Sequence, residues 1–136
     1  MSKRILIIDQ SRTIQTLLST YFKNGGHQVI AQSTPQQALQ VLETLRDAPD
    51  MIFLALHIDE KAAYQVIRYV KGWATYDHTE LVVMVSQEDK PHIERTLTHI
   101  TIHYLVKPFH IRQALAFVGR DNAVLHTNRA IGNGPS

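Results

Sequence analysis

Five short apolar runs alternate with five segments of helical periodicity along this chain. The runs occupy residues 4–8, 27–31, 51–56, 81–85 and 104–106. They are rich in Val, Ile and Leu and show little polar alternation, which is typical of strands buried on both faces of a parallel sheet. Short crossovers between parallel strands require helices on both faces. The alternation therefore predicts an α/β fold, a (βα)5 doubly wound parallel five-stranded sheet.

The segments between the runs carry helix stripes and helix start signals. The first places apolar side chains at i, i+3, i+4 and i+7, beginning with Ile14, and Ser11 precedes it as an expected N-cap. Thr34 followed by Pro35 marks the start of the second helix, because proline fits the first helical position. Comparable apolar stripes predict three further helices, over Ala62–Val70, Ile93–Leu97 and Ile111–Val118.

Length and composition favour a single globular domain. The chain has 136 residues, of which 44% are hydrophobic and 19% are charged. Helical periodicity stops near residue 121, so we expect a domain at residues 1–120 and a flexible C-terminal tail or linker stub at 121–136. The absence of cysteine excludes disulfides and thiol chemistry.

Charge and hydropathy narrow the classes of partner. The chain has 14 basic and 12 acidic residues, and a net charge of +2 is too small to indicate nucleic acid or an anionic membrane. No helix-turn-helix pattern follows the last apolar stripe, so we expect no nucleic-acid partner within this chain. The apolar runs are far shorter than a membrane span, and no signal peptide precedes the first of them. A cytoplasmic protein is the simplest interpretation.

The residues that follow the strands are the candidates for function. Parallel α/β sheets place their functional crevice at the carboxyl ends of the strands, near the switch in strand order. The residues there are Asp9-Gln10, Leu56-His57, Ser86-Gln87 and Lys107-Pro108.

The motifs around these strand ends resemble those of the receiver domain of two-component response regulators. They appear in order as ILIIDQS, PDMIFLAL, LVVMVS and YLVKPF, over about the first 120 residues. The Lys-Pro-aromatic motif after the fifth strand is the most specific. The resemblance implies a flavodoxin-like sheet with strand order 2-1-3-4-5, a cis peptide before Pro108, and a role in phosphorelay signal transduction.

In the family, an aspartate accepts a phosphoryl group from a histidine kinase. Further carboxylates hold a divalent metal, and a lysine and a hydroxyl bind phosphate oxygens. An aromatic residue on the fifth strand changes rotamer. The matching positions here are Asp9 and Gln10 for the two metal-binding acids, Ala55 for the phosphoacceptor, Ser86 for the hydroxyl, Lys107 for the lysine and Tyr104 for the switch aromatic.

Two of these matches depart from the chemistry that phosphoryl transfer needs. A methyl group at Ala55 can neither attack phosphorus nor ligate a metal, and Gln10 offers a neutral amide where Mg²⁺ prefers a carboxylate. We therefore expect no catalytic residue, no enzyme activity and no cofactor, with Mg²⁺ binding weak or absent. Asp9 is either a residual metal ligand or, as we favour, the buried ion-pair partner of Lys107. His57, at the mouth of the degenerate pocket, adds a titratable group.

The sequence thus predicts a pseudo-receiver, which acts as a phosphorylation-independent protein-interaction module. Its partner would be a kinase, an effector or a second copy of the chain, bound through residues 90–120, and a homodimer is compatible with this. The alternative is an atypical receiver that still binds a phosphoryl group or an anion beside Lys107 and Ser86. Ser86 has a structural alternative too, as a cap at the start of the following segment.

Overall fold

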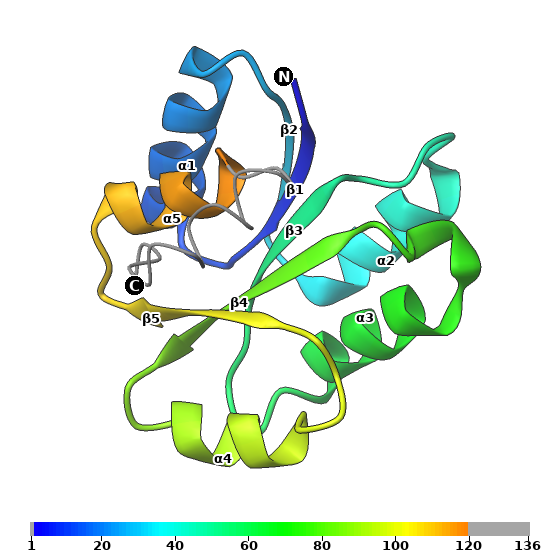
Figure 1. Ribbon diagram of the computed structural model, residues 1–136, viewed down its shortest axis with the longest axis vertical. Coiled ribbons are helices and arrows are strands. Elements are labelled where there is room, and N and C mark those ends of the chain that lie inside the picture. Colours follow the sequence, from blue (N-terminus) through cyan, green and yellow to red (C-terminus); the bar gives the residue numbers. More distant parts are fainter. Residues whose placement is uncertain (1, 120–136) are drawn as a thin grey trace, which may run out of the picture.

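The computed structural model describes residues 2–119, and the expected tail at 121–136 lies outside them. Its centre is a parallel sheet with the order β2-β1-β3-β4-β5, as predicted (Figure 1). The strands are β1 (Arg4–Ile8), β2 (Gln28–Gln32), β3 (Met51–Ala55), β4 (Glu80–Ser86) and β5 (His103–Lys107). The helices are α1 (Arg12–Asn24), α2 (Pro35–Thr44), α3 (Lys61–Gly72), α4 (Lys90–Thr96) and α5 (Ile111–Val118), with a short 3₁₀ helix, η1, at Ala74–Tyr76.

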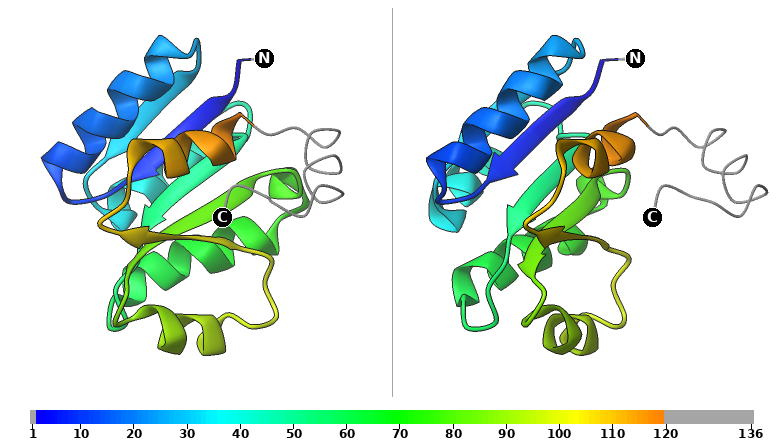
Figure 2. Two further views of the ribbon diagram at one scale, coloured as in Figure 1. Left: turned by 60° about the vertical axis from the view of Figure 1, so that its left-hand side comes forward. Right: turned by 90° about the vertical axis from the view of Figure 1, so that its left-hand side faces the viewer.

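The helices form two layers, one on each face of the sheet (Figure 2). Alternate strand residues face opposite layers, because successive side chains of a strand point to opposite faces. Leu6 and Ile52 pack with α2, α3 and α4, whereas Ile7 and Phe53 pack with α1 and α5. Within the described residues, no helix is both long and apolar enough to cross a membrane. The strands β1, β3 and β4 are thus buried on both faces, as their continuous apolar composition indicated, whereas the edge strands β2 and β5 are partly exposed.

The predicted start signals act as helix caps. Ser11 Oγ accepts a hydrogen bond of 3.2 Å from the Ile14 N–H, and Thr34 forms a capping box with Gln37. The peptide before Pro108 is cis, as the resemblance implied.

The structure differs from the sequence prediction mainly at element ends. The second strand is one residue later than predicted, and Leu56, included in the third apolar run, is buried beyond the end of β3. The helix η1 was not predicted, because a single 3₁₀ turn leaves no periodicity to detect.

The central strand gives a test of the packing. Phe53 is fully buried, and its ring centroid lies 5.1 Å from that of Phe22 on α1. Phe53→Ala should lower the free energy of unfolding by about 3–5 kcal/mol, because it removes a large buried ring and leaves a cavity. Trp73→Ala is the control, because Trp73 is 60% exposed, and should cost under about 1 kcal/mol. Urea unfolding measures both, and equal losses would contradict this description of the core.

Candidate functional site

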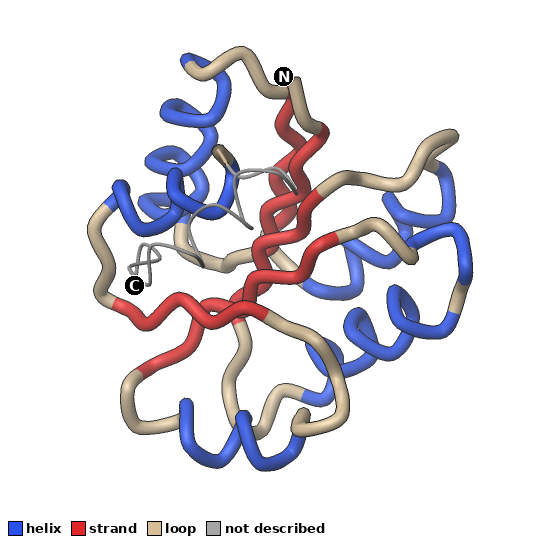
Figure 3. Tube along the Cα trace, viewed as in Figure 1, coloured by secondary structure: helices blue, strands red, loops and turns tan. Residues whose placement is uncertain are grey.

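The predicted site residues meet at one edge of the sheet. Ala55, Ser86 and Lys107 end β3, β4 and β5, and Asp9 directly follows β1. Parallel strands bring these ends to the same edge of the sheet, whose strands are drawn in red in Figure 3. The structure therefore brings these residues to one edge of the sheet, where Asp9, Gln10, Ala55 and His57 are among the residues that line a small hollow.

Asp9 and Lys107 form a direct ion pair. Lys107 Nζ donates a hydrogen bond of 2.6 Å to Asp9 Oδ2, and the Asp9 side chain is 4% exposed. The Ser11 N–H donates to the other carboxylate oxygen at 2.9 Å. The predicted pairing is confirmed, and both oxygens of the buried carboxylate have partners. Since a buried polar group needs such partners, these contacts account for the burial of the Asp9 side chain without a metal.

The chain around Asp9 is fixed by a contact that sequence reasoning missed. Gln15 Nε2 donates to the Asp9 backbone carbonyl at 2.6 Å and to Ser33 Oγ at 3.1 Å. This amide joins the β1–α1 loop to the chain that follows β2. Nothing in the sequence pattern indicates it, because Gln15 lies in an ordinary amphipathic helix.

The donor set does not fit a magnesium ion. Asp9 already has a partner at each oxygen, Gln10 is exposed, and Ala55 contributes only a methyl group. The hollow beside Ala55 has a volume of about 20 Å³, and His57 and Glu60 border it. Among residues 2–119 no group of three His, Cys, Asp or Glu side chains is placed to hold a metal. Mg²⁺ needs several oxygen ligands in a near-octahedral arrangement, which these residues do not supply.

Ser86 caps the loop that follows β4. Its Oγ accepts a hydrogen bond of 3.0 Å from the Asp89 N–H, so the structural alternative for Ser86 is confirmed. The Asp89 carboxylate in turn accepts from the Ile58 N–H at 3.2 Å, which joins the β4–α4 loop to the β3–α3 loop. Asp89 was missed in the sequence. Its spacing from Ser86, Ser-x-x-Asp, is a capping signature that would have drawn attention to it.

Tyr104 is a residue of β5, and its half-buried ring faces α4. Lys90 Nζ is 5.9 Å from its ring centroid and also pairs with Glu94 at 3.7 Å. Burial raises the pKa of the Tyr104 phenol above its usual value, and the negative charge of Glu94 and the neighbouring Tyr64 raise it further. The ring thus belongs to the contact between the sheet and α4.

These features define a class of protein before any comparison. A five-stranded parallel sheet with a lysine, a hydroxyl and an acid at its carboxyl edge, and a cis proline after β5, has the architecture of a response-regulator receiver. A family model for the response regulator receiver domain matches residues 5–118. This chain belongs to that family. Receiver domains are signalling modules rather than enzymes, and they interact with proteins such as kinases and effectors.

Individual relatives agree with the family assignment. The response regulator protein FleR of Pseudomonas aeruginosa is 24% identical over 120 residues, covering 88% of this chain and 24% of FleR. The two-component response regulator ORR1 of Oryza sativa subsp. japonica is 26% identical over 113 residues, covering 77% of this chain and 49% of ORR1. The chain thus spans about a quarter of the length of one of these curated relatives and about half of the other.

A solved structure supports the fold independently. The chemotaxis response regulator CheY4 of Vibrio cholerae superposes with a TM-score of 0.72 at 19% identity, covering 87% of this chain and 97% of that protein. At this identity the likeness establishes the arrangement of strands and helices, which is the receiver arrangement.

The ion pair can be tested by removing its cation. Lys107→Met leaves the buried Asp9 carboxylate without a countercharge, and should lower the free energy of unfolding by about 1–3 kcal/mol. Adding Asp9→Asn should recover part of this loss, because no charge then remains buried. Lys90→Met is the control, since its pair with Glu94 is exposed, and should cost under about 1 kcal/mol. A loss for Lys107→Met no larger than the control's would contradict the assigned role.

The raised pKa of Tyr104 predicts a loss of stability in alkali. An unfolded tyrosine ionises near pH 10, whereas the folded phenol holds its proton to higher pH. The folded state therefore binds more protons above about pH 10, and stability must fall as the pH rises there. Tyr104→Phe should make that decline shallower in unfolding measured against pH. An unchanged slope would show that Tyr104 contributes nothing to it.

Proposed function

We propose that this receiver acts as a pseudo-receiver, which binds protein partners without being phosphorylated. The observation that carries the proposal is the methyl group of Ala55 at the end of β3, where receivers carry the phosphoacceptor aspartate. An alanine side chain has no lone pair with which to attack a phosphoryl group. Without the acceptor, phosphorylation of this position cannot shift the population of conformations.

The bonds already made in the pocket support the same function. Lys107 and Ser86, which would contact phosphate oxygens in an active receiver, are bonded to Asp9 and to the Asp89 N–H. A phosphoryl group would have to share the Lys107 ammonium with Asp9 to gain a bond there. Asp89 also joins the loops after β3 and β4 through the Ile58 N–H, so that the pocket has a connected structure without a ligand.

The surface proposed for partners comprises residues 90–120, of which 90–119 are described. It contains α4, β5 and α5. In the family this face mediates dimerisation and contact with effectors or kinases. Lys90 of α4 lies over the Tyr104 ring of β5, with its Nζ 5.9 Å from the ring centroid, and so joins these two elements. We propose that this face keeps one conformation, since the pocket beneath it makes its contacts without phosphate.

Phosphodonor treatment tests the proposal. The protein is incubated with acetyl phosphate, or with beryllofluoride, in the presence of Mg²⁺, and intact mass and NMR shifts are recorded. We expect no covalent adduct and no shift at Lys107, Ser86 or Tyr104, because the acceptor atom is missing. The matched control is Gln10→Asp combined with Ala55→Asp, which restores two carboxylates and should give a detectable adduct or a beryllofluoride response.

A stable adduct on the unmodified chain would overturn the proposal. Shifts confined to the neighbourhood of Lys107 and Ser86, without a mass change, would instead support the alternative of an atypical receiver that binds an anion there. The small volume of the hollow beside Ala55 and the carboxylates of Asp9 and Glu60 argue against that alternative, because like charges repel an anion.

A further inference from the structure

The strand β2 has one open edge. In the described residues it pairs with β1 alone, and the sheet ends there (Figure 1). The Gln28 N–H donates to Lys3 and the Gln32 carbonyl accepts from Asp9, so that these two residues bond toward β1. Because bonding direction alternates along a parallel strand, the backbone groups of Val29 and Ala31 face the open edge.

This edge lacks the devices that usually block strand pairing. Natural edge strands carry lysine, proline or a bulge that prevents another strand from adding. The sequence of β2, QVIAQ, contains no charged residue and no proline, and its register with β1 runs without a bulge. Ile30 is 38% exposed, one of three exposed large hydrophobic residues in residues 2–119.

An apolar hollow flanks this edge on the α2 side. The helix α2 has 10 residues against 13 in α1, and the chain leaves it in an extended conformation at Leu45. On this side of the sheet Ile30 remains partly exposed. The hollow has a volume of about 420 Å³, and Leu6, Ile30 and Leu45 are among its lining residues. Arg4 and Arg46 also border it, and Arg4 pairs with Asp47 at 3.4 Å.

A second hollow, on the α1 side, has a different chemistry. It has a volume of about 280 Å³ and extends from Ala31 to the exposed side of α1. Arg12 and Lys23 lie among its lining residues, none of which is acidic. Neither cation has an ion pair within the described part of the chain. A strand added beside β2 would have one set of side chains over each hollow, since side chains alternate between faces.

We propose that the open edge of β2 is a docking site for an extended segment of another protein in which apolar residues alternate with Asp or Glu. The segment adds to the sheet as a sixth strand, through the backbone groups of Val29 and Ala31. Its apolar side chains enter the α2-side hollow, and its carboxylates face Arg12 and Lys23. Backbone bonds supply affinity in such strand addition, and the side-chain pockets supply specificity.

The charges disfavour a second copy of this chain as the occupant. If the β2 strands of two copies paired edge to edge, the added strand would have the sequence QVIAQ, which contains no carboxylate to face Arg12 and Lys23. The like charges of two copies of α1 would instead approach one another, which opposes association. The docking site is also separate from residues 90–119, and it does not depend on whether the pocket is phosphorylated.

Amide hydrogen exchange gives a direct test. The full chain is titrated with an acetylated, amidated hexapeptide of alternating glutamate and valine, followed by NMR. At nine-tenths saturation the Val29 and Ala31 amides should exchange about tenfold more slowly, because only the free fraction exchanges. Binding without slower exchange at these two amides would overturn the proposal, as would absence of binding at millimolar peptide. Protection of both amides before peptide is added would show that the edge is already covered, and would also overturn it.

Backbone methylation of the peptide separates strand addition from charge attraction. Two peptides are compared, one N-methylated at every valine and the other at every glutamate. One of them should lose binding and the other should keep it, because only alternate amides face β2. If the peptide with methylated valines loses binding, the segment lies parallel to β2. If the peptide with methylated glutamates loses binding, the segment lies antiparallel to β2. Equal binding of both would overturn the proposal.

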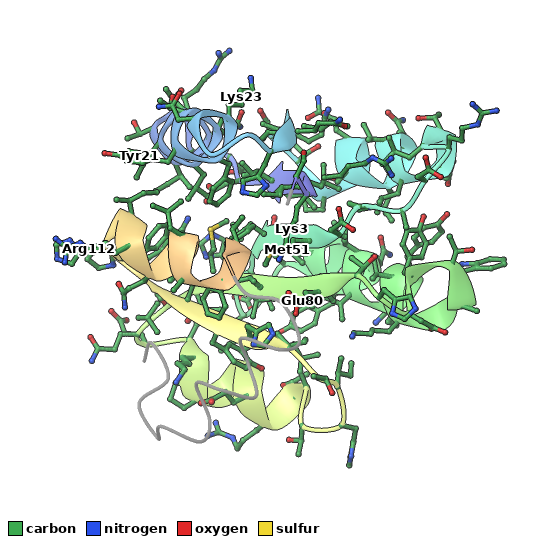
Figure 4. All side chains as sticks on the ribbon, turned by 45° about the horizontal axis from the view of Figure 1, so that its top comes forward. Lys3, Tyr21, Lys23, Met51, Glu80 and Arg112 are labelled. Carbon is green, nitrogen blue, oxygen red and sulfur yellow. The ribbon has the colours of Figure 1, made fainter. Side chains whose placement is uncertain are left out.

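Charge variants test which residues select the segment. Arg12→Glu combined with Lys23→Glu should weaken binding about tenfold. Arg112→Glu is the control with unchanged affinity, since Arg112 projects outward from α5 (Figure 4). A lysine–valine peptide should not bind. Equal binding of this peptide, or concentration-dependent dimers in sedimentation with the same amides protected, would rule out the acidic segment as the occupant.

Discussion

The ion pair between Asp9 and Lys107 joins two strands that are not neighbours. Asp9 follows β1 and Lys107 ends β5, so that the pair spans the ends of β3 and β4. Ala55 ends β3, one of the two strands that lie between the members of the pair. The same contact compensates a buried carboxylate and holds the carboxyl edge of the sheet together.

Under the proposed function, loss of the acceptor is compatible with retention of the lysine. An alanine at position 55 removes a charge that the lysine would otherwise meet, and Asp9 is the carboxylate that remains for it. Asp89 has a comparable role in the loop after β4, where its carboxylate accepts a hydrogen bond from the Ile58 N–H. The pocket of this receiver is thus a set of internal bonds, and such bonds stabilise one arrangement of the loops.

The sequence was sufficient for the fold because local and global signals agree. Apolar runs, the Ser11 and Thr34 caps and the motif at Lys107-Pro108 each indicated the element that the structure contains. The Asp9–Lys107 pair followed from the need to compensate a buried charge. Contacts between separate loops were harder to predict, because the bonds of Gln15 and Asp89 depend on distances that no periodicity encodes. The hollows beside β2 were missed for a similar reason, since they depend on how α1 and the chain after α2 pack beside the edge strand.

The methyl group of Ala55 has a consequence for timing. A phosphorylated aspartate hydrolyses, and its lifetime sets how long a conventional receiver stays active. A receiver without an acceptor has no phosphorylated state whose lifetime could limit its activity. Under the proposed function, the fraction of partner bound depends only on the concentrations of the two proteins and their affinity. Synthesis and degradation of the chain then determine the duration of its signal, and the response persists for as long as the protein does.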